Sequence, residues 1–149
     1  MTVSRICNPN VATVGAGEDV VDAAALMRKE HVGDLIVVER RGSANVPIGI
    51  LTDRDIVVGV VAKRVSPDSV TVGDAMTREL LTVREDASLE FALREMRRYG
   101  VRRAPVVRAN GDLVGVIALD DVIQHLAAQL SRLADLIRVE QDAETRARP

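Results

Sequence analysis

Short apolar stretches alternate with helix-period stripes along the chain, and this pattern predicts two copies of a strand-helix-strand-strand-helix order. In the first copy, three apolar stretches predict strands: residues 11–14, 34–39 and 46–51. Asp19 is expected to cap a helix that ends near Gly33. The face of that helix expected to pack inward holds Val20, Ala24, Met27 and His31. A second helix is expected over residues 53–63.

The second copy has the same order. Ser88 is expected to cap its first helix, and Gly100 is expected to end it. The apolar stripe of that helix is Leu89, Leu93 and Met96. Asn110-Gly111, between two apolar runs, is typical of a hairpin with a two-residue type I′ turn. The hairpin of the first copy, across residues 40–45, is expected to have a looser tip.

Individual residues recur at a nearly constant displacement. Thr13-Val14 returns as Thr82-Val83, 69 positions later. The stretch from Gly49 to Val57 returns as Gly115 to Ile123, 66 positions later. A duplicated unit of this length predicts an α/β (α+β) fold made of two β-α-β-β-α halves around a shared core.

The division between the halves is expected near a short connector. We expect residues 1–66 to form the first motif and residues 67–149 to form the second. Residues 65–77 are expected to be a structured connector with a short helix, because Thr71 and Asp74 have the spacing of a capping box.

Composition narrows the range of partners. Hydrophobic residues make up 47% of the chain and aromatic residues only 1%, so any flat ligand must be enclosed by aliphatic side chains. A net charge of −2 without a basic block favours neither nucleic acid nor an anionic membrane as a partner. The single Cys7 excludes an internal disulfide, and no apolar run approaches the roughly 20 residues that cross a bilayer. We therefore expect a cytoplasmic protein.

The last helix is longer than a core of this size requires. Its apolar stripe is Ile123, Leu126, Ala127, Leu130, Leu133, Ala134 and Ile137. Either this stripe packs across its own domain, or part of it meets another subunit. After Val139 the sequence becomes polar, and the helix is expected to fray there.

Few residues suggest catalysis. Gly15-Ala16-Gly17 lacks the third glycine of a dinucleotide fingerprint and is expected to be a turn. His31 and His125 have no nucleophile or metal-ligand spacing nearby. The acid pairs Asp53/Asp55 and Asp120/Asp121 lie at helix starts, where the macrodipole favours carboxylates. The sequence therefore predicts neither a catalytic residue nor a metal site.

The stretch from Gly49 to Asp55 is the strongest candidate for binding chemistry. It places the Thr52 hydroxyl and the Asp55 carboxylate three residues apart where a strand becomes a helix. This is the spacing of a capping box, which needs no ligand. The same geometry also suits a nucleotide, because free helix N–H groups attract phosphate and a carboxylate accepts from a sugar diol.

These motifs together resemble a tandem pair of cystathionine-β-synthase (CBS) domains, called a Bateman module. The resemblance rests on the paired halves, on Gly49 to Asp55, on Val101 to Val107 as the strand motif and on Val72 to Thr77 as the connector. It implies a pseudo-twofold arrangement with two clefts between the halves, where adenosine-containing ligands bind. The residues that the resemblance assigns to one cleft are Thr52, Asp55, Ile50, Leu81, Arg102, Arg103 and Pro105.

The other cleft is altered. The residues at its corresponding positions are Asp121, Ala118, Gly33, Asp34 and Ile36. The threonine hydroxyl is lost at Ala118, and Asp34 is expected to repel phosphate. We therefore expect one competent nucleotide site per chain, and a second cleft that is empty or binds a less anionic ligand.

The resemblance implies a stand-alone, non-catalytic regulatory module that pairs into a homodimer and acts on an unidentified effector protein. Its ligand is expected to be AMP, ADP, ATP, NAD or S-adenosylmethionine, acting as an effector and not as a catalytic cofactor. Two alternatives remain open. One is a structural homodimer whose clefts bind nothing, and the other is a metal-dependent phosphate-ester hydrolase that uses the paired aspartates.

Overall fold

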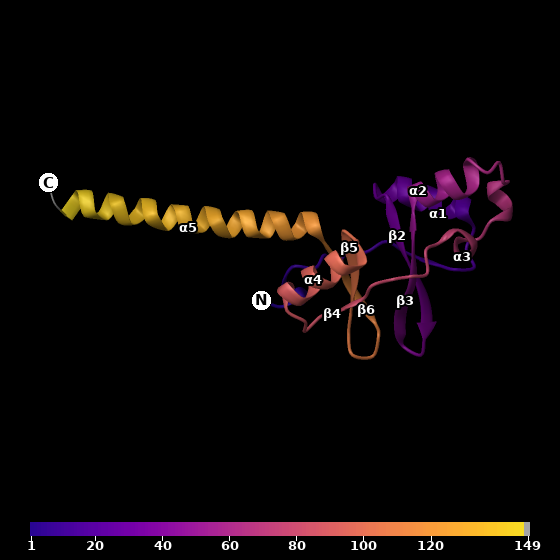
Figure 1. Ribbon diagram of the computed structural model, residues 1–149, viewed down its shortest axis with the longest axis horizontal. Coiled ribbons are helices and arrows are strands. Elements are labelled where there is room, and N and C mark those ends of the chain that lie inside the picture. The colour runs from indigo at the N-terminus through magenta and orange to yellow at the C-terminus, as the bar shows by residue number, and fades with distance from the viewer. Residues whose placement is uncertain (148–149) are drawn as a thin grey trace.

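In the computed structural model, which describes residues 1–147, the chain forms two three-stranded sheets that lie against each other (Figure 1). The first sheet consists of β1 (Thr13–Gly15), β2 (Asp34–Arg41) and β3 (Ala44–Thr52). The second consists of β4 (Val83–Arg84), β5 (Arg103–Val107) and β6 (Leu113–Ala118). In each sheet the first two strands pair in parallel and the last two pair antiparallel. The predicted fold class and the duplication are confirmed.

Helices α1 (Val20–Glu30) and α4 (Leu89–Tyr99) join the parallel strands and end in the same way. The Asp19 carboxylate accepts from the Val21 N–H, and the Ser88 hydroxyl accepts from the Phe91 N–H, as predicted. His31 and Gly100 follow the two helices in the left-handed conformation. His31 is therefore exposed, which corrects the prediction that it shares the inward face of α1. The buried residues of that face are Val20, Ala23 and Met27.

The first hairpin has the tighter tip and the second has the looser one, which is the opposite of the prediction. Strands β2 and β3 stay paired as far as Arg41 and Ala44, so only Gly42 and Ser43 form the tip. The second hairpin closes through five residues, 108–112, with the Gly111 N–H donating to the Arg108 carbonyl. A type I′ turn requires positive φ at both central residues, but among the described residues only His31 and Arg64 are non-glycine residues with positive φ. The prediction of a type I′ turn at Asn110 was therefore wrong.

The final helices of the two halves differ most. In the first half, α2 (Asp53–Ile56) continues into a π-helical turn, Val57–Val61. In the second half, α5 (Leu119–Ala147) extends far beyond the body of the molecule (Figure 1). Its stripe does not pack across its own domain, because Ile123, Leu126, Leu130, Leu133 and Ile137 are 45–67% exposed. The helix also continues past Val139, so the expected fraying there was wrong.

Each core borrows a segment that the sequence assigned to the other half, residues 1–66 or 67–149. Val3, in the 3-10 turn Val3–Arg5, is buried in the core formed by α4, β5 and β6. Val72, in helix α3 (Val72–Ala75), is buried in the core of the first half. A further 3-10 turn, Pro67–Ser69, precedes α3. The division at residues 66 and 67 therefore stays a prediction about repeat units, because the two cores interleave.

Gly49 and Gly115 lie where these borrowed segments cross the sheets. A Cβ atom at Gly49 would lie 2.8 Å from the Thr77 carbonyl oxygen, and one at Gly115 would lie 2.8 Å from the Asn8 carbonyl oxygen. Both distances are shorter than van der Waals contact allows, so only glycine admits the crossing segment.

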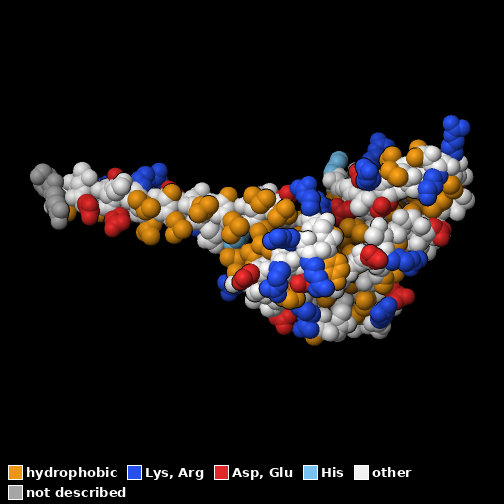
Figure 2. Space-filling model, in the orientation of Figure 1, with side chains coloured by type: hydrophobic (Ala, Val, Ile, Leu, Met, Phe, Trp, Pro, Cys, Tyr) orange, Lys and Arg blue, Asp and Glu red, His pale blue; other side chains and the backbone are white. Residues whose placement is uncertain are grey.

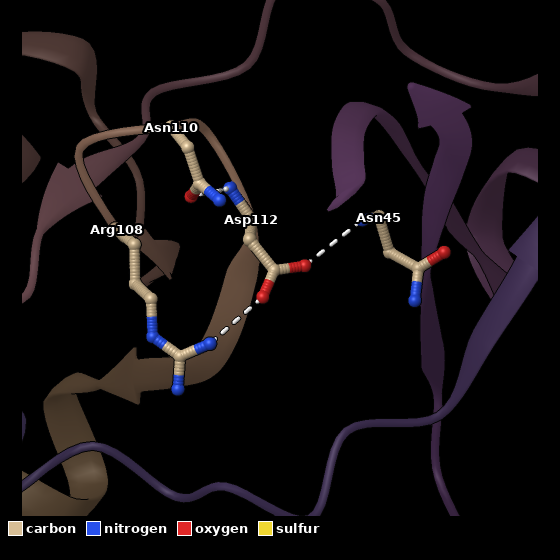
Figure 3. A network of polar contacts seen from close by, with 4 residues as sticks. All are labelled: Asn45, Arg108, Asn110 and Asp112. Carbon is tan, nitrogen blue, oxygen red and sulfur yellow. Dashed lines mark hydrogen bonds and ion pairs between the residues drawn. The ribbon is translucent and has the colours of Figure 1, made fainter. Parts of the chain in front are cut away.

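A polar network joins the two hairpins (Figure 3). The Asp112 carboxylate accepts from the Asn45 N–H of the other half at 2.9 Å and pairs with Arg108 at 2.9 Å. The Asn110 side chain accepts from the Asp112 N–H at 3.1 Å. This network holds the tip of the second hairpin against the first half.

Candidate functional site

The larger cleft, of about 680 Å³, lies between the end of β3 and the start of β5. Six of the seven residues predicted for it line its wall: Ile50, Thr52, Asp55, Leu81, Arg102 and Arg103. Pro105 does not, because it lies two residues further along β5, buried and paired with Val116. The position of Pro105 corrects that part of the sequence-based assignment.

Thr52 and Asp55 form the predicted capping box at the start of α2. The Thr52 Oγ1 accepts from the Asp55 N–H at 3.1 Å, and the Asp55 Oδ2 accepts from the Thr52 N–H at 2.9 Å. Within the described residues, Asp55 Oδ1 makes no such hydrogen bond, although the residue is only partly exposed and lines the cleft. One carboxylate oxygen is thus fixed by the backbone, and the other is left to accept from a ligand.

The two arginines of the strand motif are already paired with carboxylates. Arg102 pairs with Asp120 at 3.1 Å across exposed side chains. Arg103 pairs with Asp34, whose side chain is only 16% exposed. Asp34 and Asp120 both line the larger cleft, which the sequence-based assignment did not include. A ligand phosphate would meet these arginines in competition with the two carboxylates.

The smaller cleft, of about 300 Å³, contains four of the five residues predicted for it: Asp34, Ile36, Ala118 and Asp121. Gly33 instead lines the larger cleft, because its carbonyl accepts from the Asp53 N–H at 2.9 Å beside the capping box. Helix α5 lacks a side-chain oxygen at Ala118 that could cap its start. The volume of this cleft is at the lower limit of ligand pockets, about 300–1,000 Å³.

Sequence reasoning missed residues that the borrowed segments bring to the clefts. Asn8 and Asn10 line the smaller cleft, and Thr77 and Glu79 line the larger one. These two pairs are 69 positions apart, which is the displacement of the repeat. Extending the repeat to the start of the chain would have found them.

Two kinds of feature are absent from residues 1–147. In that range no group of three or more His, Cys, Asp or Glu side chains is arranged to hold a metal ion. In the same range no helix combines the length and the apolar character that spanning a membrane requires.

The comparisons with known proteins agree with the duplicated fold. A family model described as the CBS domain matches residues 3–61 and 72–128. An uncharacterised protein of Methanopyrus kandleri, MK0525, is 34% identical over 124 residues, or 83% of this chain, and the chain spans 62% of the length of that relative.

Two solved structures have the same arrangement. Hypoxic Response Protein I, with two coordinated zinc ions, is 33% identical with a TM-score of 0.72, over 84% of this chain and 98% of that one. The cytosolic domain of the Mg²⁺ channel MgtE, in complex with ATP, is 26% identical with a TM-score of 0.70, over 83% of this chain and 48% of that one.

Proposed function

The chain belongs to the CBS domain family, as its motifs predicted, and on that basis we propose that it is a non-catalytic regulatory module whose larger cleft binds an adenosine-containing ligand. The ligand acts as an effector. By contacting both halves, it favours the mutual orientation that binds it best, and so shifts the population of conformations.

The observation that carries the proposal is the free oxygen of Asp55. Its Oδ2 atom is fixed by the Thr52 N–H, so the carboxylate is oriented before any ligand arrives. The Oδ1 atom has no hydrogen bond of this kind, and Asp55 lines a cleft whose volume falls within the range of small-molecule pockets. A vicinal diol such as that of ribose supplies the O–H donors that such an acceptor requires.

The aliphatic part of the wall suits a base. Ile50 and Leu81 come from different halves, and Val101 lies beside them. With no aromatic side chain among the residues that line this cleft, a planar base is enclosed by aliphatic contacts alone. The ATP complex of the MgtE domain supports an adenosine ligand for this fold.

Titration calorimetry with adenosine, AMP, ADP, ATP and NAD tests the proposal. We expect one site per chain, and we expect Asp55→Ala to weaken binding roughly tenfold or more, because a charge-assisted hydrogen bond is lost. Asp121→Ala is the matched control in the smaller cleft and is expected to change the affinity little. Two equivalent sites, or an affinity that Asp55→Ala leaves unchanged, would overturn the proposal.

A second function has its own supporting observation, the exposed stripe of α5. Hydrophobic side chains gather along the projecting helix (Figure 2). Ile123, Leu126, Leu130, Leu133 and Ile137 follow one another at alternating spacings of three and four, the pattern of a coiled-coil seam. We propose that the protein is a homodimer with this stripe in its interface. Native mass spectrometry reports the subunit number and any retained ligand together.

No observation favours the metal-dependent hydrolase. The carboxylates of Asp53 and Asp55 accept from the N–H groups of Arg54 and Thr52, so both are bound to backbone groups at the start of α2.

A further inference from the structure

Asp34 and Arg103 occupy equivalent positions in the two halves, and they meet. They are 69 residues apart, which is the displacement of the repeat, and each begins the central strand of its sheet, β2 or β5. Their ion pair therefore lies where the two halves face each other. Both residues line both clefts.

The two arginine pairs of the larger cleft differ in how easily they exchange partners. In the Arg102–Asp120 pair the side chains are 75% and 58% exposed, so water replaces either partner at little cost. In the Arg103–Asp34 pair the exposed fractions are 46% and 16%. A phosphate that takes Arg103 leaves the Asp34 carboxylate largely shielded from water, without its cation and beside a second anion.

The rest of the wall does not offset this cost. The cleft is lined by three arginines, Arg54, Arg102 and Arg103. It is also lined by five acids, Asp34, Asp53, Asp55, Glu79 and Asp120. A cleft with more carboxylates than guanidinium groups repels each added phosphate charge.

We propose that Asp34 is a specificity-determining residue that competes with ligand phosphate for Arg103, so that the larger cleft selects adenosine-containing ligands of low negative charge. Adenosine leaves the ion pair intact, AMP brings about two negative charges, and ATP brings more. This inference rests on the proposed function, because it specifies which ligand that site accepts.

The test is calorimetry of the whole protein with adenosine, AMP and ATP at constant ionic strength. We expect wild type to bind ATP more weakly than adenosine. Asp34→Asn frees Arg103. It is expected to raise the affinity for ATP roughly tenfold and to change the affinity for adenosine less than about twofold. In the double variant Asp34→Asn with Arg103→Gln, the gain for ATP is expected to disappear.

The matched control is Asp53→Asn. It removes the same charge from the same cleft, but the Asp53 carboxylate accepts from its neighbour Arg54 and does not pair with Arg103. If Asp53→Asn raises the affinity for ATP as much as Asp34→Asn does, the ligand preference is set by the total charge of the cleft and not by competition for Arg103. The inference then fails. An ATP affinity that Asp34→Asn does not change also overturns it.

A different result of the same experiment would reject the proposed function. If neither wild type nor any variant binds adenosine, AMP or ATP, the cleft is not an adenosine site, and both proposals fall. If adenosine binds but the three ligands do not differ in affinity, the proposed function stands and only the role of Asp34 is rejected. Thermal unfolding of each variant confirms that it is folded, and Asp34→Ser repeats the test if the asparagine variant is unstable.

Discussion

The two clefts have the same scaffold and present different chemistry. In each, a borrowed segment crosses the sheet at a glycine, Gly49 or Gly115, and a helix starts four residues further along. At that start the larger cleft has Thr52, and the smaller cleft has Ala118. Duplication preserved the backbone that builds a cleft, while substitutions on its walls changed what it can hold.

The contact between the halves shows the same divergence. A symmetric pair would place like charges, or two identical side chains, opposite each other. Asp34 and Arg103 instead form an ion pair between equivalent positions. Each half therefore supplies what the other lacks, and the two clefts share one charged wall.

The difference in length between the final helices gives the largest expected effect. Leu130 and Leu133 are 67% and 60% exposed on α5, beyond the point where the corresponding helix of the first half ends. Replacing both with glutamine removes apolar burial from two helices, and we expect the dimer to weaken by about 4 kcal/mol, or roughly a thousandfold in Kd. Sedimentation over a concentration series measures this.

Val139→Gln is the control for that experiment. Val139 is 62% exposed on the same helix but lies outside the seam of three- and four-residue spacing. It is expected to leave the Kd within a few-fold of wild type. A wild-type protein that stays monomeric at high concentration, or a dimer that tolerates the double substitution, would show that the stripe has another role.

The glycines test whether the shared scaffold is essential in both halves. An added Cβ at Gly49 would lie 2.7 Å from Met76 Sδ and 2.8 Å from the Thr77 carbonyl oxygen. We expect Gly49→Ala and Gly115→Ala each to cost about 1–3 kcal/mol, because the crossing backbone must shift. In a chain of this length the Tm falls by about 3 °C per kcal/mol.

Gly59 provides a matched control within a helical turn. A Cβ there meets nothing within 4 Å, and alanine is the better helix former. Gly59→Ala is therefore expected to hold or raise the Tm. If all three alanine variants melt alike, the crossing segments are not fixed by close contact at the glycines.

The difference between Thr52 and Ala118 is expected to affect the free energy of unfolding less than the glycines do. Thr52→Ala removes the hydroxyl that accepts from the Asp55 N–H at 3.1 Å, and a lost N-cap costs about 1 kcal/mol. Ala118→Thr restores the capping spacing with Asp121 and has open space in the smaller cleft, so a gain of less than about 1 kcal/mol is expected. Opposite shifts of the Tm in the two variants would confirm the comparison. Equal shifts would refute it.

The sequence predicted local hydrogen bonding better than long-range contacts. The caps at Asp19 and Ser88 and the box at Thr52 were correct because each joins residues two or three positions apart. The hairpin tip at Asn110 was wrong because its geometry depends on the other half, where the Asn45 N–H donates to Asp112 (Figure 3). No pattern within the hairpin itself contains that contact.

The candidate site shows the same limit. The family resemblance led to Thr52, Asp55 and the two arginines, since motif positions carry over from the sequence. It did not reveal that Arg103 is held by Asp34, because that depends on how the two halves face each other. Pro105 was misplaced because strand positions two residues apart share a face but differ by about 7 Å along the strand.

The smallest expected effect concerns the connector, where the repeat again differs. Thr71 and Asp74 form a capping box on α3, but the equivalent Thr2 makes no side-chain cap, and Arg5 stands in place of the aspartate. Hydrogen bonds from the Thr71 N–H and hydroxyl lower the pKa of the Asp74 carboxyl from its ordinary value of 3.8. A lowered pKa means that this stabilisation is present above about pH 3.8 and is lost as the pH falls through the lower, folded-state value.

Asp74→Asn is expected to melt slightly below wild type at pH 6 and to approach it at pH 2.5. The difference in Tm between the two proteins isolates Asp74, because they differ at no other residue. A difference that stays constant from pH 6 to pH 2.5 would show that the ionised carboxylate does not stabilise this turn.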